Sequence, residues 1–219
     1  MARDLAVILN NGSINSAVTT ALAAQKYRPI TLYVAPVADP ASNSRQAYDA
    51  QVAYFRPYRE HTVAMPMLSA WPERPSQPQG PYDPRLRPKL GPQLTQLLPI
   101  LAIAAGYAAQ YQAAAIYLGL RVGPHNDELA QATEFCQIWT ELLQHPCEQG
   151  ELELIAPILE LEPWQVVDLG YQLAVPFERT WSCVDESSEP CWACVRCRAR
   201  EAAFQQSGRP DPLRQARRP

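Results

Sequence analysis

The sequence predicts an α/β protein, with a parallel sheet covered by helices on both faces and a small cysteine-rich module at its C-terminal end. Short apolar runs alternate with helix-like segments along the first 175 residues, as in strands joined by crossover helices. Four of the six cysteines then fall within fifteen residues. A local change of this kind in composition is typical of an appended metal-binding module.

The N-terminal third predicts the order strand, helix, strand, helix, strand. Leu5–Leu9 is an apolar run that ends at a polar turn, which is typical of a buried strand followed by a loop. Because parallel neighbours need crossover connections, the alternation favours a parallel sheet. The segments that follow are expected as a helix at Ser16–Lys26, a strand at Ile30–Val37, a helix at Ser44–Arg56 and a strand at His61–Met67.

Prolines are concentrated after the third strand. The chain has 22 prolines, about twice the usual share, and seven of them lie in residues 72–92. A loop of this length is usually either functional or disordered. Residues 72–92 are therefore expected to form a lid or a disordered insertion.

The second half repeats the alternation of helix and strand. Apolar residues dominate a long helical segment, and a later short helix has proline near its start and glycine near its end. We expect an α/β domain at residues 1–175, a cysteine module at 176–212 and a tail at 213–219. The elements are expected as helices at Gln93–Gln110, Glu128–Leu143, Pro163–Gly170 and Arg198–Gln206, and strands at Ala114–Gly119 and Leu152–Pro157.

The cysteine module predicts a structural zinc site. Its ligands would be Cys183, Cys191, Cys194 and Cys197, of which the last three have the spacing C-x2-C-x2-C. Zn²⁺ takes four such ligands in a tetrahedron, and a closed shell leaves no position for substrate. The alternatives are an iron–sulfur cluster, a redox pair and two disulfides. Disulfides are least expected, because Cys136 and Cys147 lie elsewhere in helix-like surroundings and no secretory signal is evident.

The loop after the first strand is a candidate anion site. Residues Asn11, Gly12, Ser13, Ile14, Asn15 and Ser16 combine a glycine, small polar side chains and the start of a helix. Free amides and the helix dipole favour an anion there. Neither a dinucleotide fingerprint nor a Walker sequence is present. The alternative is an ordinary turn in which Asn15 or Ser16 caps the helix.

Charge and hydropathy exclude two classes of partner. The formal net charge is -3, so no overall positive field favours direct nucleic-acid binding. No run of 18 apolar residues indicates a membrane span. We expect a cytoplasmic protein.

A few isolated polar and aromatic residues carry weaker signals. His61 is expected to be structural, and His145 has no evident partner. Asp127 and Glu128 could contact a substrate, although an acidic residue at a helix start is more often a cap. Trp181 and Trp192 flank the cysteines and are expected to pack the module or a dimer interface.

The C-terminal segment resembles a known family. The matching positions are Thr180-Trp181-Ser182-Cys183, Glu189-Pro190-Cys191, Cys194, Cys197, Arg200, Phe204, Gly208, Asp211 and Pro212. This pattern is similar to the zinc segment of the 7-cyano-7-deazaguanine synthases, which are PP-loop pyrophosphatase-fold ligases. Weaker similarity extends over nearly the whole chain.

The resemblance implies a Rossmann-like fold of the adenine nucleotide alpha hydrolase type and a reaction on 7-carboxy-7-deazaguanine. ATP would activate the carboxylate as an acyl-adenylate, ammonia would displace AMP to give an amide, and a second activation would give the nitrile. A phosphate loop with the pattern S-G-G-x-D-S would hold the phosphates, with Mg²⁺ offsetting their charge. The resemblance also implies a homodimer.

This chain departs from the family pattern at chemically important positions. Asn11 replaces serine, Ser13 replaces the second glycine and Asn15 replaces aspartate, whereas Gly12 and Ser16 are kept. Gln96-Leu97 occupies the position where the family has an Arg-Asn pair, and Pro163 occupies that of a lysine. In the substrate segment after Gly119, the remaining candidates for contact with a purine are His125, Asp127 and Glu128.

Two main hypotheses follow. The chain is either an ATP-dependent carbon–nitrogen ligase for a 7-deazapurine carboxylate, with Asn15 and Ser16 as candidate catalytic residues, or a catalytically silent paralogue that serves as a partner or regulatory subunit. The departures favour the second, because each lost group that stabilises transition-state charge can cost about 10²- to 10³-fold in rate. A third hypothesis is a ligase for a different carboxylate.

Overall fold

The computed structural model describes residues 4–37, 39–70, 90–124, 128–145, 152–185 and 187–215. Within these residues a five-stranded sheet has the order β3-β2-β1-β4-β5, and every neighbouring pair is parallel. The predicted α/β class is therefore confirmed. The strands are β1 (Leu5–Leu9), β2 (Arg28–Ala35), β3 (Arg59–Ala64), β4 (Ala115–Leu118) and β5 (Glu153–Ile155).

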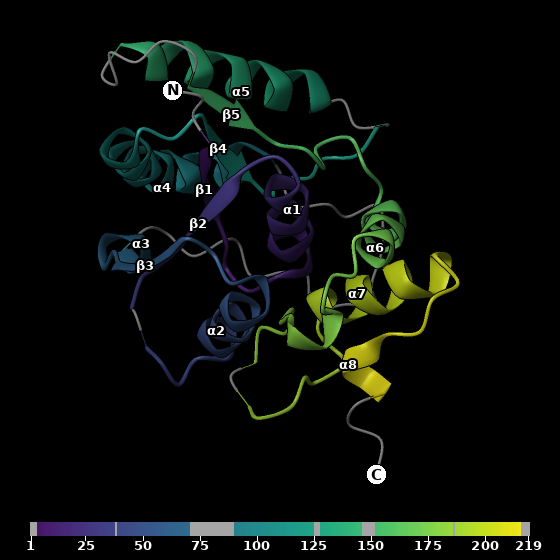
Figure 1. Ribbon diagram of the computed structural model, residues 1–219. Coiled ribbons are helices and arrows are strands. Elements are labelled where there is room, and N and C mark those ends of the chain that lie inside the picture. Colours follow the sequence, from purple (N-terminus) through teal and green to yellow (C-terminus); the bar gives the residue numbers. More distant parts are fainter. Residues whose placement is uncertain are drawn as a thin grey trace.

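Helices connect the strands and cover both faces of the sheet (Figure 1). The longer ones are α1 (Ile14–Ala24), α2 (Asn43–Phe55), α4 (Leu90–Tyr111), α5 (Leu129–Gln144), α6 (Pro163–Gln172) and α7 (Val195–Gln206). The short ones are α3 (Met67–Ala70), the 3₁₀ turn η1 (Phe177–Arg179) and α8 (Pro212–Gln215). None of the helices in the described ranges has the length and apolar character needed to span a membrane.

The period of two along β1 explains why both faces are covered. Val7 and Leu9 pack into the cluster formed with α4 and α5. Ala6 and Ile8 point to the opposite face, where they pack in a cluster with Ala23 of α1. Because successive side chains of a strand alternate between faces, an apolar run such as this one is buried on both sides.

The chain reverses its direction of travel across the sheet between β1 and β4. It proceeds outward from β1 to β2 and β3, and then returns through α4 to place β4 on the other side of β1. In open parallel sheets, the crevice at such a switch point is the usual ligand site. The loop after β1 lies at this position.

The C-terminal helices continue the core on the α1 side. Gly170 of α6 lies so close to Phe177 that a Cβ there would meet the ring at 2.3 Å. The rings of Phe177 and Phe204 pack edge to face at 5.2 Å. The buried members of this cluster are Ala17, Val18, Ala21, Ile158, Val166, Val167, Val175, Phe177, Ala203 and Phe204. The cysteine segment is thus anchored to the α/β core, and the boundary after residue 175 stays a prediction.

Several elements begin or end a few residues from the predicted positions. α1 begins at Ile14 because Ser13 already caps it, with its side chain accepting from the Ser16 N–H. α7 begins at Val195 because Cys194 is its N-cap. α4 begins at Leu90, so the last three residues of the proline-rich 72–92 segment are helical. Residues 72–89 lie outside the described residues.

Candidate functional site

The loop between β1 and α1 depends on Gly12. This residue has a φ of +79°, and a Cβ at its position would lie 2.4 Å from the carbonyl oxygen of Ser44. A left-handed backbone without a side chain is what glycine provides. The retained glycine therefore sets the path of the loop against α2.

A buried asparagine holds the start of the loop in place. Asn10 is 2% exposed, and its side-chain amide donates to Gln51 Oε1 at 2.9 Å and to Thr20 Oγ1 at 3.2 Å. Its own Oδ1 accepts from the Gly12 N–H at 2.8 Å. These hydrogen bonds offset the free-energy cost of burying the Asn10 amide. Asn10 is therefore a structural residue that supports the loop.

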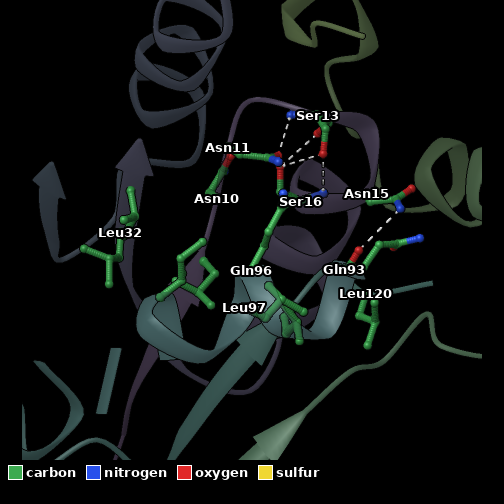
Figure 2. Close-up of a pocket in the computed structure, with 15 residues that line it drawn as sticks. Asn10, Asn11, Ser13, Asn15, Ser16, Leu32, Gln93, Gln96, Leu97 and Leu120 are labelled. Atoms are coloured by element: carbon green, nitrogen blue, oxygen red, sulfur yellow. Dashed lines mark hydrogen bonds between the residues drawn. The ribbon is translucent and has the colours of Figure 1, made fainter. Parts of the chain in front are cut away.

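Asn11, Ser13 and Ser16 form a small polar network (Figure 2). Asn11 Oδ1 accepts from the Ser13 N–H at 3.2 Å, and the Ser16 hydroxyl lies 3.1 Å from the same oxygen. Ser13 Oγ accepts from the Ser16 N–H at 3.3 Å. The cap of α1 is therefore Ser13, and the expected alternatives Asn15 and Ser16 do not cap the helix.

Two backbone donors at the start of α1 stay open. The N–H groups of Ile14 and Asn15 have no hydrogen-bond partner within the described parts of the chain. The Asn15 side chain instead donates to the carbonyl of Gly119, the residue that follows β4, at 3.3 Å. Open N–H groups at a helix start favour an anion.

A pocket of about 300 Å³ opens beside this loop at the carboxyl ends of β1, β2 and β4. Figure 2 shows loop side chains on one side of it and apolar side chains such as Leu32, Leu97 and Leu120 on another. Gln93 and Gln96 of α4 also line it. Its described lining holds no charged residue, only amides, hydroxyls and apolar groups. Such a combination suits a flat, uncharged polar ring.

Two further pockets meet the other side of the loop. Their volumes are about 360 and 420 Å³, and Asn11 and Ser13 line both. The opposite wall comes from the C-terminal half of the chain through Trp181, Ser182 and Arg196. The loop therefore lies where three openings meet.

The C-terminal segment is hydrogen-bonded directly to the loop. The Trp181 N–H donates to the Gly12 carbonyl at 2.9 Å. The buried Gln51 side chain donates to the same carbonyl at 3.0 Å and to the Arg179 carbonyl at 3.1 Å. These bonds connect the turn at Gly12 to the residues just before the first cysteine.

The four predicted cysteines come together. The sulfur atoms of Cys183, Cys191, Cys194 and Cys197 all lie within 4.8 Å of one another. A tetrahedral Zn²⁺ with bonds of about 2.3 Å separates its sulfurs by about 3.8 Å, so the four sulfurs are close enough together to hold a single ion.

Backbone N–H groups point at these sulfurs. The Cys194 N–H donates to Cys191 Sγ at 3.3 Å and the Cys197 N–H to Cys194 Sγ at 3.4 Å. Hydrogen bonds from Ala193 and Cys194 lower the pKa of Cys191 to about 7, which favours the thiolate that a metal binds. Burial raises the pKa of Cys183 and Cys197. The cluster can hold a metal.

The predicted substrate residues are only partly placed. His125 and Asp127 lie outside the described residues. Glu128 accepts from the Leu90 N–H at 2.9 Å, so its carboxylate contacts the start of α4. It makes no side-chain cap to α5, which begins directly after it. Glu128 is not among the described residues that line the three pockets beside the loop.

His61 lies in β3, away from the loop. Its Nε2 is 2.8 Å from the Tyr111 hydroxyl, and its ring stacks on Tyr107 with centroids 4.4 Å apart. Burial, with a contribution from Arg59, lowers its pKa. These contacts agree with the structural role predicted for it.

Several residues of the site carry no clear signal in the sequence. Asn10 and Gln51 are uncharged amides whose burial becomes evident only when α2 packs on the loop. Arg196 looks like an ordinary surface charge between two cysteines. The sequence offers one weak local signal, which is that Asn10 directly follows a strand, where ligand sites of parallel sheets form.

Comparison with known proteins matches this chain mainly in its C-terminal half, which contains the cysteine cluster. The family model described as "Queuosine biosynthesis protein QueC" matches residues 97–208, slightly more than half of the chain. The match includes the four cysteines and begins after the 11–16 loop.

Curated relatives cover a similar share. The 7-cyano-7-deazaguanine synthase of Aliarcobacter butzleri is 35% identical over 115 residues, which are 52% of this chain and 50% of that protein. That of Nostoc punctiforme is 31% identical over 117 residues, 52% of each chain. The matched stretch thus spans about half the length of these relatives.

Solved structures show a weaker likeness. The "U34-tRNA thiolase NcsA from Methanococcus maripaludis with its [4Fe-4S] cluster" is 13% identical, with a TM-score of 0.49 over 97% of this chain and 66% of that one. The NAD+ synthetase from Burkholderia pseudomallei is also 13% identical, with a TM-score of 0.44 over 98% and 79% of the two chains. The family model, together with the clustered cysteines that it includes, decides the assignment: the chain belongs to the QueC family.

Proposed function

We propose that this chain is a 7-cyano-7-deazaguanine synthase-like protein that holds the phosphates of ATP on the loop of residues 11–16. The observation that carries the proposal is the pair of open N–H groups at Ile14 and Asn15, next to a glycine turn and a pocket at the switch point of the sheet. This arrangement presents donors to an anion without any movement of the backbone.

The pocket of about 300 Å³ would take the adenosine part of the nucleotide. Its apolar lining from Leu32 and Leu97 suits the faces of a purine, and the amides of Gln93 and Gln96 suit its edges. The phosphates would then extend over Asn15 and Ser16. A pocket that pairs apolar walls with a few polar groups is typical of small-molecule sites.

The candidate reaction is ATP-dependent activation of a 7-carboxy-7-deazaguanine-type carboxylate. A carboxylate oxygen would attack the α-phosphorus of ATP, forming the acyl-adenylate and releasing pyrophosphate; ammonia would then displace AMP to give the amide. The chain's part is to orient the phosphates and to stabilise the charge on the leaving pyrophosphate, for which Ser16 offers a hydroxyl and the loop its N–H groups. Mg²⁺ would enter bound to the phosphates, because no carboxylate lines the pockets around the loop in the described residues.

We further propose that the cysteine cluster binds Zn²⁺ as a structural ion. Support comes from the mutual distances of the sulfurs, which suit one tetrahedral ion, and from the composition of the cluster, whose four candidate ligands among the described residues are all cysteines. The ion would connect the segment at Cys183 with the start of α7. Metal analysis of the purified protein, with zinc and iron measured together, separates this proposal from an iron–sulfur cluster.

One observation favours a second candidate, a catalytically silent paralogue that acts as a partner or regulatory subunit. Asn11 Oδ1 already accepts from the Ser13 N–H and lies within reach of the Ser16 hydroxyl. These are two donors that an anion on the loop would otherwise use. The Asn11 amide oxygen thus occupies donors that a phosphate would need, and we would then expect weak ATP binding or none.

The proposal also includes the oligomeric state of the protein, which we expect to be a homodimer. The resemblance implies a homodimer, and α5 supports it with the exposed apolar side chains of Ile138 and Leu142, which are 55% and 51% exposed. Light scattering of the purified chain would show a dimer mass. A silent paralogue would instead be expected to form a complex with an active relative.

The experiment that tests the function is calorimetric titration of ATP with Mg²⁺ into the metal-loaded protein, with and without 7-carboxy-7-deazaguanine, followed by assay of AMP and pyrophosphate. Micromolar binding with AMP release supports the ligase. Absence of binding at millimolar ATP rejects it in favour of the silent paralogue. Asn11→Ser, which removes the amide oxygen, separates the two further, because restored binding in this variant would show that Asn11 blocks the loop.

A further inference from the structure

Two arginines face the phosphate loop from the C-terminal half of the chain. Arg196, on the first turn of α7, lines both the 360 Å³ and the 420 Å³ pockets, and each pocket also includes Asn11 and Ser13. Arg121, shortly after β4, lines the 360 Å³ pocket, together with Ile14 and Asn15. Ile14, Asn15 and the two arginines therefore line one cavity, and Arg121 also donates to the Leu161 carbonyl at 3.5 Å.

Arg196 makes no ion pair, side-chain hydrogen bond or ring contact in the described part of the chain, and it is exposed. The neighbouring Arg200 behaves differently. It is 4% exposed and bound by Asp211 through two hydrogen bonds of 2.6 and 2.8 Å. The charge of Arg200 is thus offset within the protein, whereas that of Arg196 is available to a ligand.

The electrostatic balance of the cavity is positive, although the chain as a whole is acidic. The formal net charge of the chain is -3. Yet the described linings of the three pockets around the loop contain no aspartate or glutamate, and their charged members are arginines. A cleft of one charge sign concentrates counter-ions of the other sign. The ligand of the 360 Å³ pocket is therefore expected to be an anion.

We propose that Arg196 and Arg121 bind the pyrophosphate part of a nucleotide opposite the N–H groups of Ile14 and Asn15, and that they offset its charge, since the described lining of these pockets offers no carboxylate to hold Mg²⁺. This inference rests on the proposed function, and it assigns the two arginines a role that lets the site bind phosphates without a divalent cation. Guanidinium groups suit phosphate oxygens because their planar donors match them in pairs.

Arg196 also lies between Cys194 and Cys197, and this position suggests a competing role. A cation there could offset the charge of the thiolates that hold the metal, with no part in ligand binding. The two roles differ in what the loss of the side chain changes: the ligand affinity in the first case, and the metal content in the second.

The experiment is calorimetric titration of inorganic pyrophosphate, and in parallel of ATP, into the metal-loaded full chain in magnesium-free buffer. We expect binding that Arg196→Ala and Arg121→Ala each weaken about 10- to 100-fold, the range for loss of a charge-assisted hydrogen bond. Arg196→Lys should retain part of the affinity. Arg198→Ala is the matched control, because Arg198 is an exposed arginine on the same helix that lines none of the three pockets.

The outcomes separate this inference from the function on which it rests. If ATP binds only with Mg²⁺ and all three alanine variants bind alike, the arginine role is wrong and the proposed nucleotide site stands. If neither ATP nor pyrophosphate binds with or without Mg²⁺, both proposals fall. If Arg196→Ala lowers the metal-to-protein ratio and leaves pyrophosphate affinity unchanged, the thiolate role replaces the one proposed here. Arg121→Ala, far from the cysteines in sequence, tests the ligand role even where Arg196→Ala folds poorly.

Discussion

Gly12 is the residue on which the shape of the loop at residues 11–16 depends. We expect Gly12→Ala to destabilise the protein by about 1–2 kcal/mol from the left-handed backbone alone, with a further cost because a Cβ would lie 2.4 Å from the Ser44 carbonyl oxygen. Gly106→Ala is the control. It places a methyl group in open space on α4 and should stabilise the protein by about 0.5–1 kcal/mol.

Urea unfolding of both variants measures these differences. Equal stability of Gly12→Ala and the parent protein would mean that the loop can adopt another path, and its open N–H groups would then be poorly fixed in place. The sign difference between the two variants is the decisive result, because the same chemical change is made at both positions.

We expect His61 to make the stability of the fold depend on pH. Its pKa is lowered from the ordinary value of 6.5, first by burial and second by Arg59. The unfolded chain therefore binds a proton at this site at higher pH than the folded chain does, so stability falls as pH drops below about 6.5 and levels off below the folded pKa. Denaturant unfolding between pH 7.5 and 5 should show this slope, and it should be smaller in His61→Gln. An unchanged slope in the variant would assign it to other groups.

At the scale of elements, the apolar runs predicted the strands and helices well because burial on both faces leaves a clear pattern. Among the helices, the largest differences from the predicted bounds lie at the starts, where single side chains decide. The third strand also begins two residues earlier and ends three residues earlier than predicted, and Met67 begins α3 instead of ending that strand. The cysteine spacing indicates only a metal ligand at Cys194, yet its sulfur also accepts from the Cys197 N–H. Cys194 is thus the N-cap of α7, which begins three residues before the predicted start. Ser13 likewise caps α1 although it stands in the place of a family glycine. When one residue has two roles, such as metal ligand and helix cap, the sequence pattern indicates only one of them.

The buried ion pair between Arg200 and Asp211 joins α7 to the segment before α8. Arg200 also donates to the Thr180 side chain at 2.7 Å and to the Phe177 carbonyl at 3.0 Å. We expect Arg200→Ala to cost about 3–5 kcal/mol, because it leaves the Asp211 carboxylate buried without its partner.

The control for this pair is an exposed one. Arg28 and Asp4 are 58% and 59% exposed, so Arg28→Ala should cost at most about 1 kcal/mol. Thermal or urea unfolding compares the two variants. A similar small loss in both would show that water replaces the buried partner, and that α7 is not held by this pair.

At the scale of the whole molecule, the parallel sheet followed from the alternation of elements, but the site needed the structure. Asn15 meets Gly119, and Gly12 meets Trp181; each contact joins residues more than 100 positions apart. Such contacts depend on where the crossover through α4 places β4, and no local pattern encodes that. The cysteine cluster could be predicted because its ligands are close in the sequence.

The contact between Trp181 and Gly12 also predicts that the cysteine cluster and the loop at residues 11–16 are coupled. Cys183 stands two residues after Trp181, whose N–H donates to the Gly12 carbonyl at 2.9 Å. If a bound metal holds Cys183 in place, its loss should loosen that hydrogen bond, because metal binding supplies folding free energy to the residues around it.

Hydrogen exchange of the metal-loaded protein and of Cys183→Ser tests this coupling. We expect the Trp181 amide and the amides of the loop at residues 11–16 to exchange at least about tenfold faster in the variant, the factor for a loss of 1.4 kcal/mol of local stability. Amides at the centre of β2, such as that of Leu32, are the control and should keep their protection because both faces of the sheet remain packed. Faster exchange confined to the cysteine segment would show instead that Gln51, which also donates to the Gly12 carbonyl, holds the loop without help from the metal.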